Sequence, residues 1–281
     1  MNNNDAPIGV FDSGIGGLTV AAAIRRHLPN EKILYIGDTA RVPYGGKSRE
    51  IIERYSIEIA QQLLDRGAKA IVIACNTASA LAAPRLHELF PEVPVQGVVQ
   101  PGARAAVAAT RSRCIGVMGT QATVASGAYE KAIAAIAPDA SVFSVACPLL
   151  VPLIEEGRFD DPVTDQIISC YLMPLLANNV DTLVLGCTHY PFIAPAIARF
   201  LGPDIALVDS AQNSALAVKD IFTKNDILAS ANATGSLDVT LTDTVEGFLR
   251  LAQTALALDI AVVKCGTSIL GDFDDAVRYG G

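Results

Sequence analysis

The sequence predicts an α/β protein with parallel β-sheets covered by helices, arranged as two related doubly wound units. Three observations support this fold class. Short β-branched runs alternate with longer helical patterns along the 281 residues, as in βαβ units. The runs 71–74 and 183–185 are apolar without interruption, which is typical of central strands buried on both faces. A strand, a polar turn and a helical segment also recur in each half of the chain.

The expected strands are short apolar runs separated by helical patterns. The strands are Ile8–Phe11, Ile33–Gly37, Ala70–Ala74, Val95–Val99, Ile115–Met118, Val142–Val145, Leu183–Gly186, Ile205–Val208, Val239–Leu241 and Ile260–Val263. The helical patterns include Gly17–His27, Ser48–Asp65, Gln121–Ile136 and Asp161–Leu176. This alternation predicts helical crossovers between parallel strands.

The two halves of the chain share a repeated segment. Ile8-Gly9-Val10 opens one copy, Ile115-Gly116-Val117 opens the other, and a polar turn with glycine follows each. A cysteine that ends an apolar run comes 67 residues after the first start and 72 residues after the second. This spacing predicts two related domains, one of residues 1–99 plus 211–281 and one of residues 100–210. The chain is expected to return to the first domain because its last segment is too short for a third doubly wound domain.

Composition argues against several classes of protein. Hydrophobic residues make up 51% of the chain, which is ample for a packed core and too apolar for disorder. The net charge of −8 argues against a nucleic-acid surface, which needs a basic patch. The N-terminus lacks the pattern of a signal peptide, and the longest apolar run, Ala255–Val263, is interrupted by Asp259. We therefore expect a cytoplasmic protein without a membrane span.

The six cysteines are scattered, with no Cys-x-x-Cys pair and no zinc spacing, so we expect reduced thiols and no metal site. Cys75 and Cys187 are distinctive because each follows a β-branched run and precedes a polar turn ahead of a helical segment. Chemistry in open α/β sheets collects outside the carboxyl ends of strands, and a helix N-terminus stabilises a thiolate. The pair predicts two acid/base groups that face one substrate. The alternative for either residue alone is a small buried hydrophobic side chain.

Polar residues follow both cysteines. Asn76-Thr77 comes after the first, and Thr188-His189 comes after the second. Backbone N–H groups, hydroxyls and the amide of these turns suit a carboxylate, and His189 can exchange a proton with the thiol or the substrate. A packing or capping histidine is the alternative, and it is preferred to a metal ligand because no further ligands cluster nearby.

The turn after the first expected strand is a further candidate. Asp12-Ser13-Gly14 opens a glycine-rich segment that precedes a helix, but it has neither the P-loop lysine nor the full dinucleotide fingerprint. Its glycines allow close approach of a ligand, and the helix N-terminus favours an anion. The alternative is that Asp12 or Ser13 simply caps the helix.

Two more segments carry candidate residues. The loop 37–48 places Tyr44 among glycines, where it covers a ligand or is an ordinary surface loop with Ser48 as a helix cap. Glu155 ends an apolar stretch that contains prolines. Buried by such neighbours, its carboxyl would have a raised pKa and act in proton transfer, whereas a solvated helix end is the alternative.

Together these motifs resemble those of the glutamate racemases, the cofactor-independent amino-acid racemases of bacterial cell-wall synthesis. The resemblance is most specific in the two cysteine motifs behind an Asp-Ser-Gly-x-Gly-Gly start. The matching segments are 9–20, 42–45, 74–80, 97–103, 119–123, 147–155 and 186–191. The resemblance implies two similar doubly wound parallel-sheet domains, related by a pseudo-two-fold axis, that face each other across a central cleft.

The resemblance also implies roles for individual residues. Cys75 would take the α-proton from D-glutamate and Cys187 from L-glutamate, with Asp12, Glu155 and His189 assisting. The residues implied to bind substrate are Asp12, Ser13, Pro43, Tyr44, Gly45, Cys75, Asn76, Thr77, Thr120, Thr123, Cys187, Thr188 and His189. No cofactor or metal is implied, and the expected partner is a second copy in a homodimer. The short N-terminus argues against activation by a cell-wall precursor, which some members achieve with a long extension.

Other functions stay open at this point. Aspartate and hydantoin racemases share the two-thiol plan, whereas arylmalonate-type decarboxylases use one cysteine. The segments 12–17 and 42–45 favour glutamate as the substrate. A non-catalytic two-domain protein that captures a small acid is the alternative from a different class, and it would tolerate the loss of either thiol.

Overall fold

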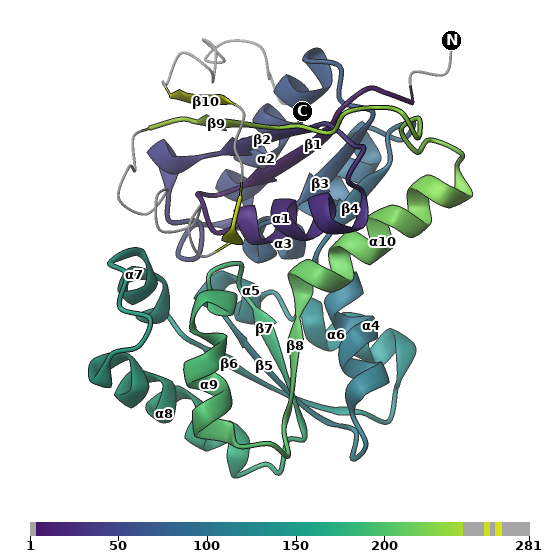
Figure 1. The fold of residues 1–281 in the computed structure, drawn as a ribbon. Coiled ribbons are helices and arrows are strands. Elements are labelled where there is room, and N and C mark those ends of the chain that lie inside the picture. Colours follow the sequence, from purple (N-terminus) through teal and green to yellow (C-terminus); the bar gives the residue numbers. More distant parts are fainter. Residues whose placement is uncertain (1–3, 244–255, 259–261, 266–281) are drawn as a thin grey trace, which may run out of the picture.

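Two β-sheets form the framework of the protein, one above the other in Figure 1, with helices on both sides of each. The computed structural model describes residues 4–243, 256–258 and 262–265. The upper sheet, sheet A, contains β1 (Ile8–Asp12), β2 (Ile33–Gly37), β3 (Ala70–Ile73), β4 (Val95–Gly97), β9 (Leu237–Leu241) and β10 (Val262–Cys265). The lower sheet, sheet B, contains β5 (Cys114–Gly119), β6 (Ser141–Ala146), β7 (Thr182–Gly186) and β8 (Ala206–Asp209).

Helices connect these strands. They are α1 (Leu18–His27), α2 (Arg49–Asp65), α3 (Asn76–Leu89), α4 (Val99–Ala109), α5 (Gln121–Ala125), α6 (Ala128–Ile136), α7 (Leu150–Glu155), α8 (Pro162–Leu176), α9 (Ala194–Leu201) and α10 (Ser210–Lys224). The 3-10 turns η1 (Thr39–Arg41) and η2 (Tyr190–Ile193) complete the set. The predicted strands agree with these bounds to within two residues at either end, although Ile260 and Ala261 lie outside the described residues.

All strand pairs of both sheets are parallel. Sheet A has the order β10-β9-β2-β1-β3-β4, and sheet B has the order β6-β5-β7-β8. The segment β2-β1-β3-β4 therefore repeats as β6-β5-β7-β8, which confirms the predicted fold of two similar doubly wound units. In each unit the direction of winding reverses beside the first strand, and ligands of open α/β sheets bind at such a switch point.

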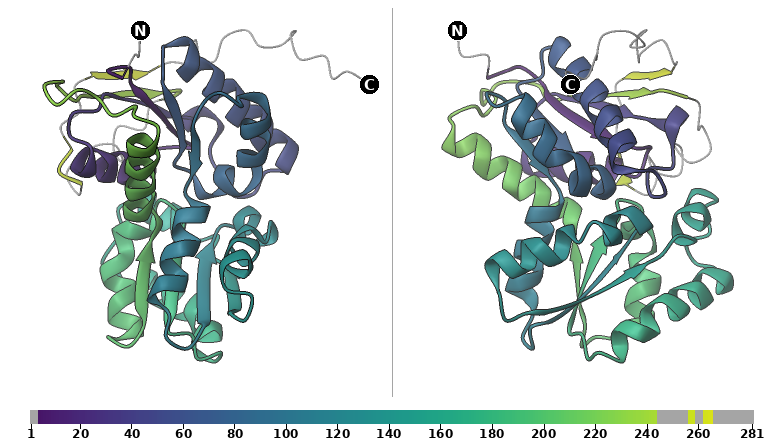
Figure 2. Two further views of the ribbon diagram at one scale, coloured as in Figure 1. Left: turned by 90° about the vertical axis from the view of Figure 1, so that its right-hand side faces the viewer. Right: turned by 180° about the vertical axis from the view of Figure 1, so that it is seen from behind.

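The chain passes between the two sheets twice. Helix α4 leads from β4 to β5, and α10 leads from β8 back towards β9. Figures 1 and 2 show α10 rising from the lower half into the upper half, where it packs against α1. Because the strands change sheet after β4 and again after β8, we propose that the domains are 1–99 plus 211–281 and 100–210.

Apolar side chains form three clusters. One, with Ile52 and Leu86, packs sheet A against α2 and α3. A second, with Ala103 and Ile133, packs sheet B against α4 and α6. The third extends over strands of both sheets and includes residues of α1 and α10, so the two halves share one continuous apolar core. This shared core holds the carboxyl ends of the strands of sheet A in place relative to those of sheet B.

Two predicted elements differ from the structure. The expected helix Gln121–Ile136 is divided into α5 and α6 at Gly127, whose φ of +61° is left-handed and open to glycine without strain. The expected strand Val95–Val99 ends at Gly97, because Val98 caps α4 and Val99 begins it. Pro101 lies in the first turn of that helix, where its missing N–H breaks no helical bond.

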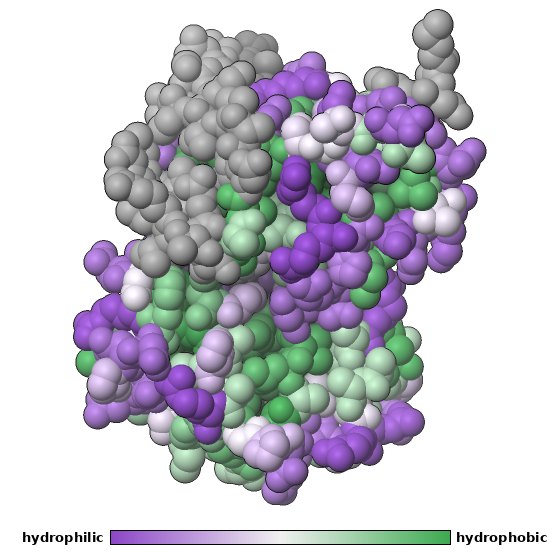
Figure 3. All heavy atoms as spheres, viewed as in Figure 1, coloured by the Kyte–Doolittle hydropathy of each residue, from purple (hydrophilic) through white to green (hydrophobic). Residues whose placement is uncertain are grey.

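Polar residues cover much of the face shown in Figure 3, and apolar residues gather on its lower half. Within the described ranges, the large exposed hydrophobic side chains between residues 100 and 210 are Ile136, Leu149, Val163 and Met173. None of the helices in the described part of the chain has the length and apolar character needed to cross a membrane.

Asp181 ties the start of sheet B to the loop before it. Its carboxylate accepts hydrogen bonds from the N–H groups of Arg111 and Ser112 and from the Thr110 hydroxyl, at 2.5–2.7 Å. Burial alone would raise the pKa of Asp181, but these bonds hold it well below its usual 3.8. Replacing Asp181 with Ala should therefore lower the free energy of unfolding by about 2 kcal/mol at pH 7.

A pH series separates this electrostatic contribution from packing. A lowered folded-state pKa stabilises the protein above the unfolded pKa and loses that effect as pH falls towards the folded value. The deficit of the Asp181→Ala variant should be constant above about pH 4 and shrink below it. Urea unfolding at pH 7, 5 and 3 measures this, with the exposed Asp220→Ala as control. A variant as stable as the parent at pH 7 would contradict the prediction.

Candidate active site

Reactive side chains from both halves meet where the carboxyl ends of the strands face each other. Asp12 ends β1, Cys75 follows β3, and Cys187 follows β7. All three are buried, with exposed fractions of 0%, 5% and 6%. Burial raises the pKa of the Cys75 thiol to about 12, and the charges of Asp12 and Cys187 add to this shift. The structure thus brings the two predicted thiols and one carboxylate into a single electrostatic environment.

Cys75 is the N-cap of α3, the place that its sequence predicts. Its Sγ accepts the N–H of Ala78 at 3.5 Å and lies 3.7 Å from the hydroxyl oxygen of Ser13. These contacts favour the thiolate, but the raised pKa shows that burial has the larger effect. At neutral pH Cys75 is therefore a thiol in this structure.

Cys187 begins a chain of three side chains. Its Sγ lies 3.8 Å from His189 Nδ1, and His189 Nε2 lies 3.1 Å from Glu155 Oε1. Burial alone would lower the pKa of His189, but its bonds to Cys187 and Glu155 and the charge of Asp12 raise it to about 10. The imidazolium form, which donates from both nitrogens, is therefore favoured near neutral pH and places a positive charge beside the sulfur.

One expectation for this side of the site is wrong, and a second holds only in part. The Glu155 side chain is 37% exposed, because its neighbour Ile154 faces the core while Glu155 extends to His189. Its role in the structure is to accept a bond from a buried histidine. Cys187 precedes a polar turn and a helical segment, as expected, but that segment opens with the 3-10 turn η2 rather than with an α-helix. The helix-dipole argument therefore applies to Cys75 alone, and His189 supplies the positive charge near Cys187.

Asp12 links the two cysteine turns. One carboxylate oxygen accepts the N–H of Gly14 at 3.0 Å, and the other accepts the hydroxyl of Thr188 at 3.5 Å. Burial raises the pKa of Asp12, while the charge of His189 and nearby backbone N–H groups oppose the shift. Asp12 is therefore bound from both halves. The N-cap of α1 is Gly17, so the helix-capping alternative for Asp12 and Ser13 is wrong.

Gly16 explains why the turn after β1 is rich in glycine. A Cβ at this position would lie 2.6 Å from both His189 Nδ1 and Thr188 Oγ1. Any larger residue would push these side chains out of place. Glycine here therefore allows the two halves to approach closely at the site.

Three threonines form a second polar cluster between the halves. The hydroxyl of Thr77 lies 2.9 Å from that of Thr120 and 3.2 Å from that of Thr123, and the last two are 3.0 Å apart. The carbonyl of Gly45 accepts the N–H of Ala122 close to this cluster, at 3.0 Å. Predicted binding residues from three separate segments are therefore adjacent.

The remaining predicted residues lie on the same turns. Asn76 is buried, and its Oδ1 accepts the Tyr129 hydroxyl at 2.7 Å, while its Nδ2 has no hydrogen-bond partner within the described part of the chain. Tyr44 is 1% exposed and bonds to Asp38, so its loop is not an ordinary surface loop. Pro43, beside it, is exposed.

Sequence reasoning missed two residues that hold this site. Asp38 directly follows β2, and its place at a strand end was a usable signal. Tyr129 lies inside α6 and reaches Asn76 in the other half. No local pattern distinguishes it from an ordinary core tyrosine.

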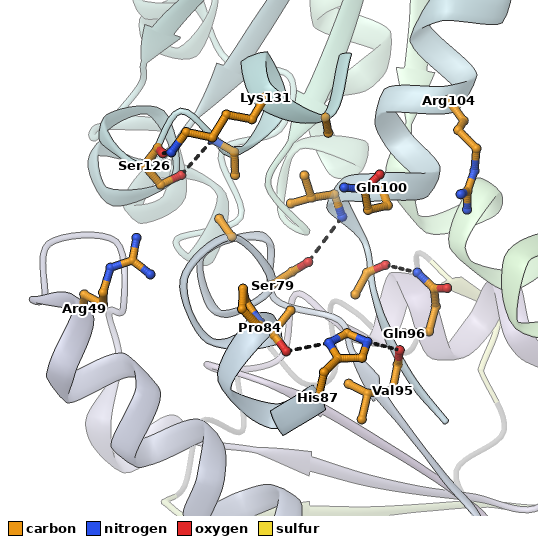
Figure 4. Close-up of a pocket in the computed structure, with 16 residues that line it drawn as sticks. Arg49, Ser79, Pro84, His87, Val95, Gln96, Gln100, Arg104, Ser126 and Lys131 are labelled. Atoms are coloured by element: carbon orange, nitrogen blue, oxygen red, sulfur yellow. Dashed lines mark hydrogen bonds between the residues drawn. The ribbon is translucent and has the colours of Figure 1, made fainter. Parts of the chain in front are cut away.

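A cavity of about 650 Å³ lies away from the cysteines, between α3, β4, α4 and α6. Figure 4 shows Arg49, His87, Arg104 and Lys131 around it. Among the described residues, no thiol or carboxylate lines this cavity, so it lacks the paired thiols of the cysteine site. In the described ranges, no group of three or more His, Cys, Asp or Glu residues is placed to hold a metal ion. The cysteine site is therefore the candidate active site.

Comparison with known proteins agrees with this geometry. The family model described as Asp/Glu/Hydantoin racemase matches residues 18–218. The chain belongs to this racemase family. Another racemase, the glutamate racemase of Geobacter metallireducens, is 47% identical over 249 residues, which cover 89% of this chain and 92% of that protein. The resemblance seen in the sequence is thus confirmed.

Solved racemase structures share the whole fold. Glutamate racemase isoform RacE1 from Bacillus anthracis has a TM-score of 0.89 at 40% identity, with 94% of this chain and 98% of that one covered. Glutamate racemase from Francisella tularensis, solved in complex with D-glutamate, has a TM-score of 0.88 at 35% identity, with coverage of 96% and 100%.

Proposed function

We propose that the protein is a glutamate racemase that interconverts L- and D-glutamate by proton transfer between Cys75 and Cys187. The observation that carries this proposal is the meeting of two buried thiols, one from each half, in one electrostatic environment. The names of the relatives, and the D-glutamate bound to the Francisella tularensis enzyme, support glutamate as the substrate. The product D-glutamate would supply peptidoglycan synthesis.

The reaction needs a base on one face of the α-carbon and an acid on the other. From L-glutamate, the Cys187 thiolate takes the α-proton and forms an S–H bond, while the electron pair of the broken C–H bond delocalises into the carboxylate. The Cys75 thiol then gives its proton to the opposite face and becomes a thiolate. From D-glutamate the two cysteines exchange roles, so atoms and charge balance in both directions.

The surroundings of the two sulfurs differ. Cys75 is a thiol because burial raises its pKa to about 12. Cys187 lies 3.8 Å from the ring of His189, whose pKa of about 10 keeps it positively charged at neutral pH. This positive charge therefore lies beside the sulfur at which negative charge is needed for proton transfer from L-glutamate.

Polar turns supply the stabilisation that the carbanion requires. The residues proposed to contact the substrate are Asp12, Ser13, Pro43, Tyr44, Gly45, Asn76, Thr77, Thr120, Thr123, Thr188 and His189. The hydroxyls of the three threonines bond to one another in this structure. A substrate carboxylate would accept them instead. Fixed donors in a buried site stabilise a developing negative charge without further reorganisation.

Incubation of each glutamate enantiomer with the purified protein in D₂O tests the proposal. We expect the circular dichroism of either enantiomer to decay to zero, with deuterium at the α-carbon of both products and no added cofactor. Exchange with aspartate but not with glutamate would refute the substrate. Binding of glutamate without any exchange would instead indicate the non-catalytic capture protein.

The cytoplasmic location and the homodimer expected from the sequence stay predictions. We propose the homodimer from the resemblance to the glutamate racemases. Light scattering during size-exclusion chromatography measures it directly, and a mass of one chain would contradict it.

A further inference from the structure

The end of β9 holds the loop that carries Tyr44 and Gly45. Thr242 directly follows this strand and is fully buried. Its hydroxyl accepts the N–H of Ala40 at 2.8 Å and donates to Asp38 Oδ1 at 3.1 Å. The Thr242 hydroxyl thus uses both its donor and its acceptor on the loop after β2.

Asp38 forms further hydrogen bonds within the loop. Its other oxygen, Oδ2, accepts the Tyr44 hydroxyl at 2.5 Å and Arg41 Nε at 2.7 Å. Its own N–H donates to the carbonyl of Asp12 at 3.0 Å. Asp38 is itself fully buried, so it cannot replace a lost protein partner with bulk water. The carboxylate therefore connects Thr242 to Tyr44.

The far end of the loop meets the opposite half of the protein. The carbonyl of Gly45 accepts the N–H of Ala122, and a Cβ at Gly45 would lie 2.8 Å from Thr120 Cβ. Tyr44 and Gly45 thus lie between the network of Asp38 and the threonine cluster. A shift of the loop would displace the polar groups proposed to contact the substrate.

We propose that Thr242 is a positioning residue that sets substrate affinity through Asp38 and Tyr44. It does not touch the reacting atoms. The inference rests on the proposed function in one respect, namely that the loop of Tyr44 and Gly45 contacts glutamate. It assigns the end of β9 a role in the site, in addition to its pairing with β2.

The chemistry of threonine suits this role. Valine has the same shape but no hydroxyl, so Thr242→Val would leave Asp38 Oδ1 and the N–H of Ala40 without this partner. Serine would keep both bonds. The start of the loop stays attached in either variant, because Thr39 Oγ1 and the backbone of Asp243 form two hydrogen bonds of 2.7 Å. We therefore expect Thr242→Val to fold with a loosened loop.

Thr240 provides a matched control on the same strand. It is 5% exposed, and its hydroxyl accepts Arg66 Nη1 at 3.3 Å rather than a group of the loop. Thr240→Val removes one buried hydroxyl from β9, and Thr242→Val removes one from the residue that directly follows this strand. Any effect that follows only from weakening this end of sheet A should appear in both variants.

The experiment compares the full-length parent with Thr242→Val, Thr242→Ser and Thr240→Val by two measurements. Steady-state kinetics should show that Thr242→Val raises KM for both enantiomers about 10-fold while kcat changes less than about 2-fold, since uniform binding is lost. Thr242→Ser should restore the parent KM, and Thr240→Val should keep it. Amide hydrogen exchange over residues 39–47 should be faster in Thr242→Val than in the other three proteins.

The outcomes separate this inference from the proposed function. A parent without glutamate turnover refutes the proposed function, while the exchange comparison still decides whether Thr242 holds the loop. Parent-like exchange in Thr242→Val overturns the inference whatever the substrate is. With an active parent, an unchanged KM in Thr242→Val, or an equal rise in Thr240→Val, overturns it as well.

Discussion

Replacing either Cys75 or Cys187 with serine should lower kcat/KM for glutamate racemisation by about 10²–10⁴-fold, the usual contribution of a positioned acid or base. Serine keeps the shape of the side chain, but its hydroxyl is a far weaker acid than a thiol and cannot supply the anionic form near neutral pH. Because L- and D-glutamate have equal free energies in water, kcat/KM must fall by the same factor in both directions. Circular dichroism of each enantiomer measures the loss.

Proton exchange distinguishes the two cysteines from each other. In Cys75→Ser, Cys187 can still remove the α-proton of L-glutamate and return deuterium to the same face, so L-glutamate should exchange without inversion. In Cys187→Ser, only D-glutamate should exchange. Cys170→Ser and Cys114→Ser are controls with free thiols that are not buried, and both should keep the parent activity. A variant at Cys75 or Cys187 that racemises at the parent rate would rule out the two-base mechanism.

The sequence predicts the fold well because burial on both faces leaves a clear pattern. Strand β3 and residues 183–185 of β7 are continuous apolar runs, and the structure buries every residue of both strands. The cysteines that follow could be placed at the strand ends without knowledge of the fold. The division at Gly127 was harder, because one glycine in an otherwise helical pattern is often tolerated at a cost of about 1 kcal/mol. The left-handed backbone of Gly127 depends on the packing of the whole fold and leaves no local pattern.

Contacts between distant segments could not be predicted in the same way. Asp38 and Thr242 are 204 positions apart, and Asn76 and Tyr129 are 53 apart in opposite halves. Such pairs depend on strand order and on the packing of one half against the other, neither of which leaves a local pattern. The exposure of Glu155 was misjudged for a related reason, since its apolar neighbours pack into the core while its own side chain turns to His189.

His189 should also contribute to stability in a pH-dependent way. Its folded-state pKa of about 10 lies above the ordinary value of 6.5, so the folded protein holds the proton more tightly than the unfolded chain. The resulting stabilisation is fully present below about pH 6.5 and is lost as pH rises through about 10. The difference in unfolding free energy between the parent and His189→Asn should therefore shrink between these pH values, as measured by urea unfolding. A difference that grows with pH would contradict the assignment.

The same substitution should lower kcat/KM by about 10²-fold near pH 7, because asparagine keeps a donor near Cys187 but removes the positive charge that favours its thiolate. The pH profile identifies this cause. In the parent, kcat/KM should fall as His189 loses its proton near pH 10. In His189→Asn that fall should be absent. His27→Asn, at the end of α1, is the control and should keep the parent profile. If His189→Asn keeps it too, the imidazolium does not activate Cys187.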